Sequence, residues 1–152
     1  MNNISYNNNE YDISLRQSYS KWIINYSIEN YGVDWKYILG LTYRKTIKNY
    51  NSSIKNVKRL YNCLVDVDST IDGFVSTEAD GGFSNLHHHL VINCEIDYDR
   101  LKNEINKVWG KIGIIDLKVY DRDRNYCYYM CKHLNKCDFN NLEILSKLDL
   151  TY

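Results

Sequence analysis

The sequence has no proline, no long apolar run and no net charge: lysine plus arginine number 19, as do aspartate plus glutamate. The lack of a long apolar run excludes a membrane-spanning helix, and a hydrophobic content of 44% excludes a disordered chain. Zero net charge gives no global electrostatic reason to expect nucleic-acid binding. The absence of proline, beside abundant Asn, Tyr, Ile and Lys, reflects an AT-rich genome rather than a mechanism. We expect a soluble globular protein that does not contact a membrane.

Cysteine occurs five times, an odd number, and never as a Cys-x-x-Cys pair. A zinc ribbon is therefore not expected, and the pattern fits reduced thiols in a cytoplasm-like compartment. The N-terminus has no basic region followed by an apolar one, so no signal peptide is predicted. The expected location is the cytoplasm.

A chain of 152 residues has room for one domain and for no second catalytic module of ordinary size. Its first twelve residues are rich in asparagine, and we expect a flexible N-terminal arm over residues 1–15. Residues 16–152 then form a single folded domain, since no internal repeat or linker divides them.

Charge is partitioned along the chain although the total is zero. Residues 35–65 contain seven Lys or Arg and no acid, whereas residues 66–99 contain eight acids and no Lys or Arg. The basic stretch could follow phosphates and the acidic stretch could collect cations. The alternative is that both are ordinary solvated faces of opposite sign.

Hydrophobic periodicity predicts alternating helices and strands. The predicted helices cover residues 18–31, 47–64, 99–109 and 124–137, and the predicted strands cover residues 35–44, 73–78, 85–96 and 112–120. After the N-terminal helix the order is β-α-β-β-α-β-α, the split βαβ pattern with one added helix. The predicted class is α+β, ferredoxin-like or RRM-like, with helices packed on a central antiparallel sheet.

The stretch "STEADGGFSNLHHHLVIN", residues 76–93, places one glutamate upstream of three consecutive histidines. Because successive side chains of a strand point to opposite faces, His87 and His89 share one face while His88 joins apolar residues on the other. A four-residue hairpin loop would pair Glu78 with His87, with Cβ atoms about 5 Å apart. We therefore expect Glu78, His87 and His89 to converge, and His88 to be structural.

One carboxylate and two imidazoles form a mixed oxygen and nitrogen ligand set. Such a set suits Mg²⁺, Mn²⁺ or Zn²⁺ and leaves coordination positions open for a substrate. The alternative is a histidine-rich strand that is simply exposed and binds no metal.

The predicted helix over residues 124–137 separates apolar from polar residues. On a helical wheel the residues that share its polar side are Tyr129, Lys132, His133 and Lys136. Tyr129 and Lys132 are neighbours at a spacing of three, and a nearby ammonium can lower the pKa of a phenol or stabilise its phenolate. The alternative is a plain surface helix.

These residues resemble the three motifs of replication initiators (Rep proteins) of the HUH endonuclease superfamily, in the family's order. The stretch "ILGLTYR" resembles the first motif, with Thr42, and "LHHHLVI" resembles the His-hydrophobe-His motif. The stretch "YMCKHLNK" resembles the tyrosine motif YxxKYxxK. The chain departs from the family at His88, usually a hydrophobe, and at His133, usually a second tyrosine. The latter favours a single-tyrosine enzyme.

The resemblance implies a metal-dependent nickase and ligase for single-stranded DNA that starts rolling-circle replication of a plasmid or virus. It implies Glu78, His87 and His89 as ligands of Mn²⁺ or Mg²⁺, Tyr129 as the nucleophile that forms a 5′-phosphotyrosine, and Lys132 as its partner. Weaker expectations for DNA contacts fall on Thr42, Tyr43, Arg44, Lys45, Lys48, Lys55, His133 and Lys136. Tyr43 is expected to stack on bases, and the helix over residues 47–64 to contact phosphates.

The expected partner is single-stranded DNA at a replication origin, with an origin hairpin as one form of it, in a host cytoplasm. No GxxxxGK[ST] motif is present, so a host or separately encoded helicase is expected, and a homodimer is plausible. One alternative is a single-tyrosine HUH transposase or relaxase. Another is a catalytically silent ferredoxin-like module that binds nucleic acid.

Overall fold

The computed structural model describes residues 8–80, 85–132 and 142–145. Its strands are β1 (Tyr37–Tyr43), β2 (Asp72–Asp80), β3 (Asn85–Asn93), β4 (Gly113–Val119) and β5 (Leu142–Leu145). Its helices are α1 (Asn8–Tyr31), α2 (Tyr50–Val67), α3 (Tyr98–Trp109) and α4 (Tyr126–Met130), with a 3₁₀ turn at Arg122–Arg124. The strands form one antiparallel sheet in the order β4-β1-β3-β2-β5. The predicted α+β, ferredoxin-like class is confirmed.

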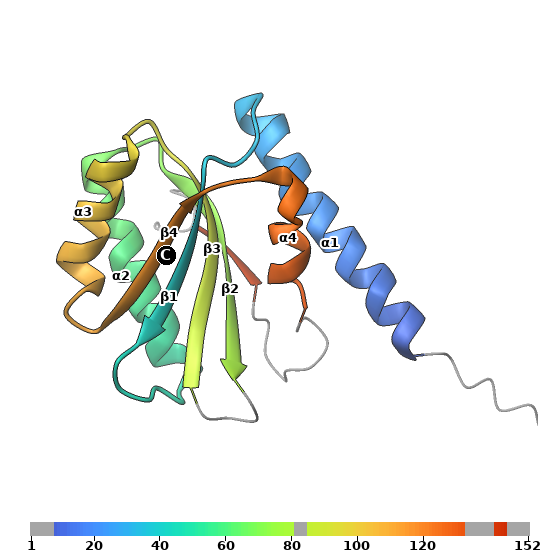
Figure 1. Ribbon diagram of the computed structural model, residues 1–152, viewed down its shortest axis with the longest axis horizontal. Coiled ribbons are helices and arrows are strands. Elements are labelled where there is room, and N and C mark those ends of the chain that lie inside the picture. The colour runs from blue at the N-terminus through green and yellow to red at the C-terminus, as the bar shows by residue number, and fades with distance from the viewer. Residues whose placement is uncertain (1–7, 81–84, 133–141, 146–152) are drawn as a thin grey trace, which may run out of the picture.

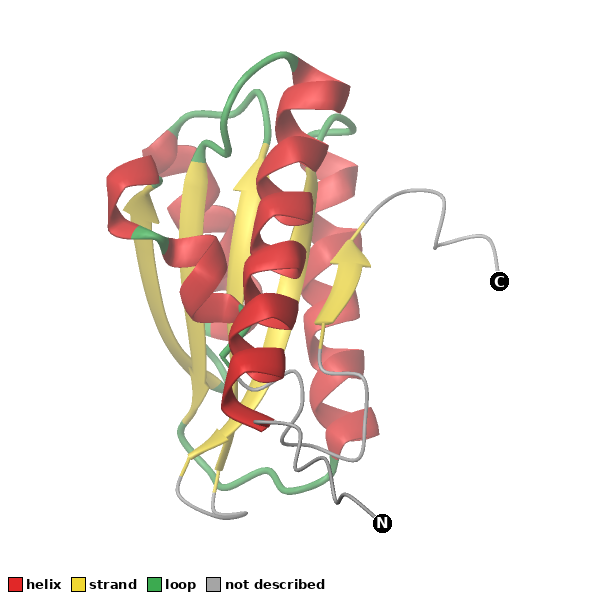
Figure 2. Cartoon of the chain, turned by 90° about the vertical axis from the view of Figure 1, so that its right-hand side faces the viewer, coloured by secondary structure: helices red, strands yellow, loops and turns green. Residues whose placement is uncertain are grey.

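Helices cover both faces of the sheet, as Figure 1 shows: α2 and α3 lie on one side, and α1 and α4 on the other. Alternation along the strands supplies an apolar layer to each side. Leu39, Leu41 and Leu90 pack under α2 and α3, and Phe74 and Val91 pack under α1 and α4. The view in Figure 2 shows α1 running along the sheet. The sheet therefore has two cores, and the face of α1 and α4 is the one that matters for the site.

Helix α2 begins at Tyr50, slightly later than the predicted start at Ile47. Asn49 caps it, because its side-chain oxygen accepts a hydrogen bond from the amide of Ser52. The predicted apolar face is confirmed, since Ile54, Val57 and Leu60 are buried. The apolar periodicity extends past the cap to a residue of the preceding loop, which explains the difference.

Helix α1 begins at Asn8, so the predicted start at residue 18 is wrong and residues 8–15 are helical rather than part of a flexible arm. The asparagine-rich composition suggested a loop because asparagine has a low helix propensity. Tertiary contacts hold the helix instead: toward its N-terminal half Arg16 Nε donates to the carbonyl of Tyr128 at 2.7 Å, and near its other end the hydroxyls of Tyr26 and Tyr31 donate to Asp72. Tertiary contacts thus override the local preference.

Two differences concern the C-terminal part of the chain. Strand β5 was not predicted, because four residues, "LEIL", give too short a pattern; it is held by pairing with β2, with Ile144 opposite Phe74. The helix predicted over residues 124–137 begins at Tyr126, and the described helix ends at Met130. Cys131 and Lys132 form a turn rather than helix, and residues 133–137 of that prediction lie outside the described residues. Within the described part of the chain, no helix combines the length and apolarity needed to cross a membrane.

Asp68, which ends α2, ties the helix to the loop before α3. Its Oδ2 accepts hydrogen bonds from the amides of Glu95 (2.6 Å) and Ile96 (3.1 Å), and its Oδ1 accepts from the amide and hydroxyl of Thr70. Burial by itself would raise the pKa of this carboxyl, but the hydrogen bonds from Thr70, Ile96 and Glu95 outweigh it and lower the pKa.

We expect Asp68→Asn to lower the free energy of unfolding at pH 7 by about 2 kcal/mol. The NH₂ group of the asparagine would replace one carboxylate oxygen, and it cannot accept the hydrogen bonds that this oxygen accepts. Since the pKa is lower in the folded than in the unfolded protein, the carboxylate stabilises above the ordinary Asp pKa of about 3.9. Its contribution is lost as the pH falls through the folded-state pKa. Urea unfolding at pH 7 and pH 3 measures this, with Asp66→Asn, an exposed residue of α2, as control. Equal losses at both pH values would contradict the role given to the charge.

Candidate metal and tyrosine site

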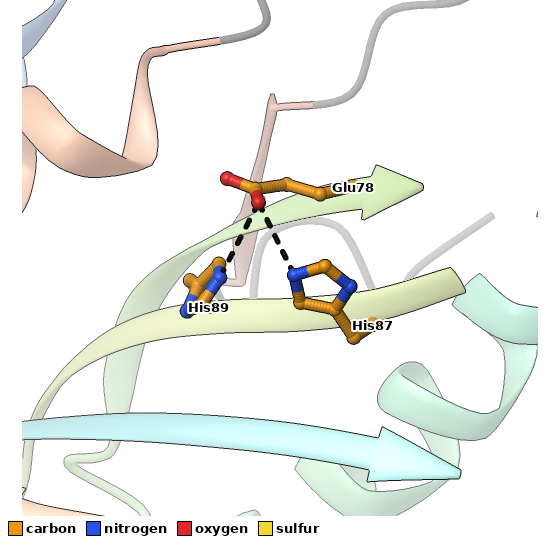
Figure 3. Close-up of side chains that lie close together, drawn as sticks. All are labelled: Glu78, His87 and His89. Carbon is orange, nitrogen blue, oxygen red and sulfur yellow. Dashed lines mark ion pairs between the residues drawn. The ribbon is translucent and has the colours of Figure 1, made fainter. Parts of the chain in front are cut away.

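The β2–β3 hairpin has the predicted register. Glu78 lies opposite His87, and Ser76 lies opposite His89. Because these residues alternate with those that pack under α2 and α3, they belong to the face covered by α1 and α4. Figure 3 shows the carboxylate of Glu78 reaching from its strand over both imidazoles. The predicted convergence of Glu78, His87 and His89 is confirmed.

The three side chains form a compact donor set. Glu78 Oε2 lies 3.2 Å from His87 Nε2 and 3.5 Å from His89 Nε2. One ligand atom from each residue can be chosen so that all lie within 4.8 Å of one another. His89 Nε2 is buried without a hydrogen-bond partner among the described residues, and a cation could lie between it and the Glu78 carboxylate. Divalent metals bind to sets of one oxygen and two nitrogen ligands. These residues therefore fit a divalent metal ion.

The carboxylate of Glu78 is almost fully buried, at 1% exposure. Burial by itself would raise its pKa, but the polar contacts with His87, His89 and Lys132 hold the pKa well below the usual range. Glu78 is thus a permanent anion at neutral pH. A buried anion surrounded by potential cation ligands is the electrostatic condition for binding a metal.

Lys132 links this anion to the candidate nucleophile. Its Nζ lies 3.0 Å from Glu78 Oε2 and 3.7 Å from the ring centroid of Tyr129. Burial acts to lower the pKa of Lys132, but hydrogen bonding to Tyr129 and Glu78 outweighs it and raises the pKa. The ring of Tyr129 also lies 5.0 Å from that of His89, edge to face. The structure therefore brings Tyr129 and Lys132 together with the histidine cluster.

Three tyrosines of the α4 segment differ in their surroundings. Tyr129 is 40% exposed, whereas Tyr126 and Tyr128 are partly buried. Burial raises the pKa of Tyr126, and its hydroxyl lies 3.3 Å from His89 Nδ1. Tyr128 packs its ring under the guanidinium of Arg16, 3.8 Å away. Among the three, Tyr129 has the phenol most accessible to a substrate.

Tyr126 was not among the predicted site residues. Its hydroxyl nonetheless contacts the nitrogen of His89 opposite the one that faces Glu78. Partners of this kind fix the orientation and tautomer of a metal-binding histidine. The i, i+3 spacing of Tyr126 and Tyr129 on one helix was the signal that could have found it.

His88 is fully buried at 0% exposure, on the face of α2 and α3, as predicted. Burial lowers its pKa to about 3, and its two ring nitrogens contact Tyr43 and Thr77. A neutral, doubly bonded imidazole is a structural residue of the core.

The residues expected to contact DNA differ in their exposure and in their distance from the site. Tyr43 is 6% exposed and packs on Trp109, so the expectation that it stacks on bases is wrong: its position on β1 points it into the core. Lys55 is exposed on α2, across the sheet from Tyr129, which removes the predicted phosphate role of that helix at the site. Thr42 and Arg44 are exposed near the end of β1.

Lys45 and Lys48 are exposed in the loop between β1 and α2. Hydrogen bonds join Ile47 of that loop to Asn85 and Leu86 at the start of β3. Both lysines therefore lie at the His87 end of the sheet. His133 and Lys136 lie outside the described residues.

An open groove of about 670 Å³ runs beside Tyr129 and was not predicted. Its lining residues are Ile38, Lys118, Val119, Tyr120, Asp121, Arg124, Tyr126 and Tyr129. Two cations and three aromatic rings thus lie along one surface. The sequence could not reveal this, because the residues come from β1, β4, α4 and the segment that joins β4 to α4.

Comparisons with known proteins give one structural likeness. No family model and no curated protein matches the chain. The crystal structure of the hypothetical protein ORF119 from Sulfolobus islandicus rod-shaped virus 1 is similar, with a TM-score of 0.53 and 14% sequence identity. The match covers 78% of this chain and 95% of that protein. At this identity the likeness shows a shared α+β fold and nothing about activity.

Proposed function

We propose that the protein is a metal-dependent endonuclease and strand transferase that nicks and rejoins single-stranded DNA at a specific site. The observation that carries the proposal is one continuous cluster: Tyr129 lies against His89 and Lys132, and Lys132 reaches Glu78. A nucleophile, a cation and a candidate metal site within one cluster are the parts that transesterification of a phosphodiester requires. Start of replication of a plasmid or virus is the role that the motif resemblance supports.

The chemistry begins at Tyr129, whose exposed phenol attacks the scissile phosphorus. A bond forms between the phenolic oxygen and phosphorus, the bond from phosphorus to the 3′-oxygen breaks, and the leaving oxygen gains, in net terms, the proton that the phenol loses. The products are a 5′-phosphotyrosine and a free 3′-OH. Because the bond count is conserved, rejoining is the reverse step and needs no ATP.

Lys132 supplies fixed positive charge to this step. Its raised pKa keeps the ammonium charged at neutral pH, where it stabilises the developing phenolate or a phosphate oxygen. Glu78, His87 and His89 would hold a divalent cation, Mn²⁺ or Mg²⁺, which when bound neutralises and orients the scissile phosphate. Tyr126 keeps the ring of His89 in place through its hydroxyl.

The groove beside Tyr129 supports single-stranded nucleic acid as the substrate. Lys118 and Arg124 can contact phosphates, and the rings of Tyr120 and Tyr126 offer surfaces for unpaired bases. Aromatic rings beside cations suit a single strand, because its bases are free to stack on them. Contacts at Lys45 and Lys48 could extend the path toward His87.

We expect the double variant Lys118→Ala, Arg124→Ala to weaken binding of single-stranded DNA, and more so at low salt. Each lost phosphate contact should lower the slope of log K against log salt by about 0.7. Fluorescence anisotropy over a salt series measures this. The double variant Lys102→Ala, Lys107→Ala on α3, at the opposite face of the sheet, should behave as wild type. An unchanged slope in the groove variant would contradict this DNA path.

The test of the proposal is a covalent adduct. The purified protein is incubated with labelled single-stranded oligonucleotides from its own replicon, with Mn²⁺ or with EDTA, and analysed on a denaturing gel and by mass spectrometry. A metal-dependent adduct on a tyrosine peptide is expected. Binding of single-stranded DNA without any adduct would favour the catalytically silent module. Which natural DNA is cut, a replication origin, a transposon end or a transfer origin, separates a replication initiator from a transposase or a relaxase.

Partners follow from the same proposal. Unwinding of the origin is part of the proposal, and we assign it to a host or separately encoded helicase, because these 152 residues contain no phosphate-binding loop motif. A homodimer would supply a second tyrosine for joining. Sedimentation with and without DNA measures the oligomeric state.

A further inference from the structure

His88 is the histidine that the candidate metal site does not use, although it lies between the two that it does. Its ring lies on the other face of the sheet, fully buried, with Trp109 of α3 edge-on at 5.9 Å. An apolar side chain would fit such a place without the cost of removing an imidazole from water. A polar residue here therefore needs a reason.

Hydrogen bonds satisfy both ring nitrogens. The hydroxyl of Tyr43 lies 3.0 Å from Nε2, and the hydroxyl of Thr77 lies 2.9 Å from Nδ1. The hydroxyl of Tyr43 also donates to the carbonyl of Ser53 at 3.1 Å. These contacts form one chain of hydrogen bonds that joins β2, β3, β1 and α2.

Donors and acceptors in this chain of hydrogen bonds can be assigned in one way. Tyr43 has a single hydroxyl proton, which goes to Ser53, so Nε2 of His88 must donate to the Tyr43 oxygen. A neutral imidazole that donates at Nε2 accepts at Nδ1, and Thr77 supplies that proton. Each donor thus meets one acceptor, and a fully satisfied buried network is rigid.

The chain of hydrogen bonds lies next to the candidate metal ligands. Thr77 immediately precedes Glu78 on β2, and His88 is flanked by His87 and His89 on β3. Thr77 and His88 are themselves opposite each other in the register. The bond between them therefore spans the same two strands as the candidate ligands, directly behind them.

We propose that the Thr77–His88–Tyr43 chain is a positioning element that fixes β2 against β3, and so holds Glu78 at the spacing from His87 and His89 that a metal ion needs. The inference rests on the metal-binding part of the proposed function and not on the nicking reaction. It makes His88 a positioning residue, acting through its neighbours. Buried polar groups often specify one arrangement rather than add stability.

The test measures metal affinity in variants that keep the core filled. Thr77→Val removes one hydroxyl without changing shape, and His88→Leu replaces the ring by an apolar side chain of similar volume. We expect both to weaken Mn²⁺ binding about tenfold, in the range seen for outer-shell partners of metal ligands. Titration calorimetry or electron paramagnetic resonance of Mn²⁺ gives the dissociation constant without any DNA.

A matched control separates positioning from stability. Leu64→Ala opens a space in the same core, near the far end of α2 from Ser53 and the hydrogen-bonded chain. It should lower the melting temperature while leaving the Mn²⁺ dissociation constant within about twofold of wild type. His88→Leu leaves the buried Thr77 hydroxyl without its imidazole partner and should also lower the melting temperature, but its loss of Mn²⁺ affinity should exceed that of the core variant. If His88→Leu does not fold, the isosteric Thr77→Val carries the comparison.

Each outcome decides something. Unchanged Mn²⁺ affinity in both variants, with binding by wild type, would overturn the positioning role and leave the metal site standing. No Mn²⁺ binding by wild type would overturn the proposed metal site and this inference together. Nitrogen NMR of the imidazole adds an independent check: protonation of His88 at Nε2 is expected, and protonation at Nδ1 instead would contradict the chain's direction.

Discussion

Replacing Tyr129 with phenylalanine is expected to abolish the covalent adduct and to lower the nicking rate by at least roughly a thousandfold, the scale of losing a nucleophile. The variant removes a single oxygen. Because the ring remains, its edge-to-face contact with His89 and its contact with the Lys132 ammonium should persist. Stability and Mn²⁺ affinity should therefore be close to wild type. The measurement is single-turnover nicking with mass spectrometry of the linked peptide.

Two neighbouring tyrosines provide matched controls for the same chemical change. Tyr128→Phe should nick at nearly the wild-type rate, because Tyr128 packs on Arg16 rather than on the site. Tyr126→Phe should lose about tenfold through a less well-held His89, and a higher Mn²⁺ concentration should partly restore it. An adduct that persists in Tyr129→Phe and is lost in Tyr126→Phe would move the nucleophile to Tyr126.

The sequence predicted the site better than it predicted the element boundaries. Strand alternation and one assumption about loop length placed Glu78 opposite His87, because register is strongly specified where one face of a hairpin is buried. The same alternation placed His88 in the core. Local rules suffice for residues that are adjacent in a strand or across a hairpin.

Other features depended on contacts that no local pattern encodes. The N-terminal extension of α1 depends on contacts such as that of Arg16 with Tyr128, far along the chain. The inward orientation of Tyr43 follows from the position of β1 beside β3, which exposes only every second residue toward the site. The groove of Lys118 and Arg124 arises where β4 meets the turn before α4. Such features need the assembled sheet.

Glu78→Gln is expected to have the second large effect, on metal binding. The substitution keeps the size of the side chain but removes the buried negative charge that faces His87, His89 and Lys132. We expect Mn²⁺ affinity to fall by at least about a hundredfold, the upper end of what even outer-shell losses cost. Nicking at limiting Mn²⁺ should disappear with it.

The effect can be read without DNA from thermal unfolding. A metal ion at a hundred times its dissociation constant stabilises the folded protein by about 2.7 kcal/mol, so wild type should gain several degrees in melting temperature with Mn²⁺. Glu78→Gln should gain almost nothing. Asp66→Asn, which removes an exposed acid of α2 on the other side of the sheet, is the control and should respond as wild type does. A full response in Glu78→Gln would mean that the carboxylate serves Lys132 alone and that the metal, if bound, lies elsewhere.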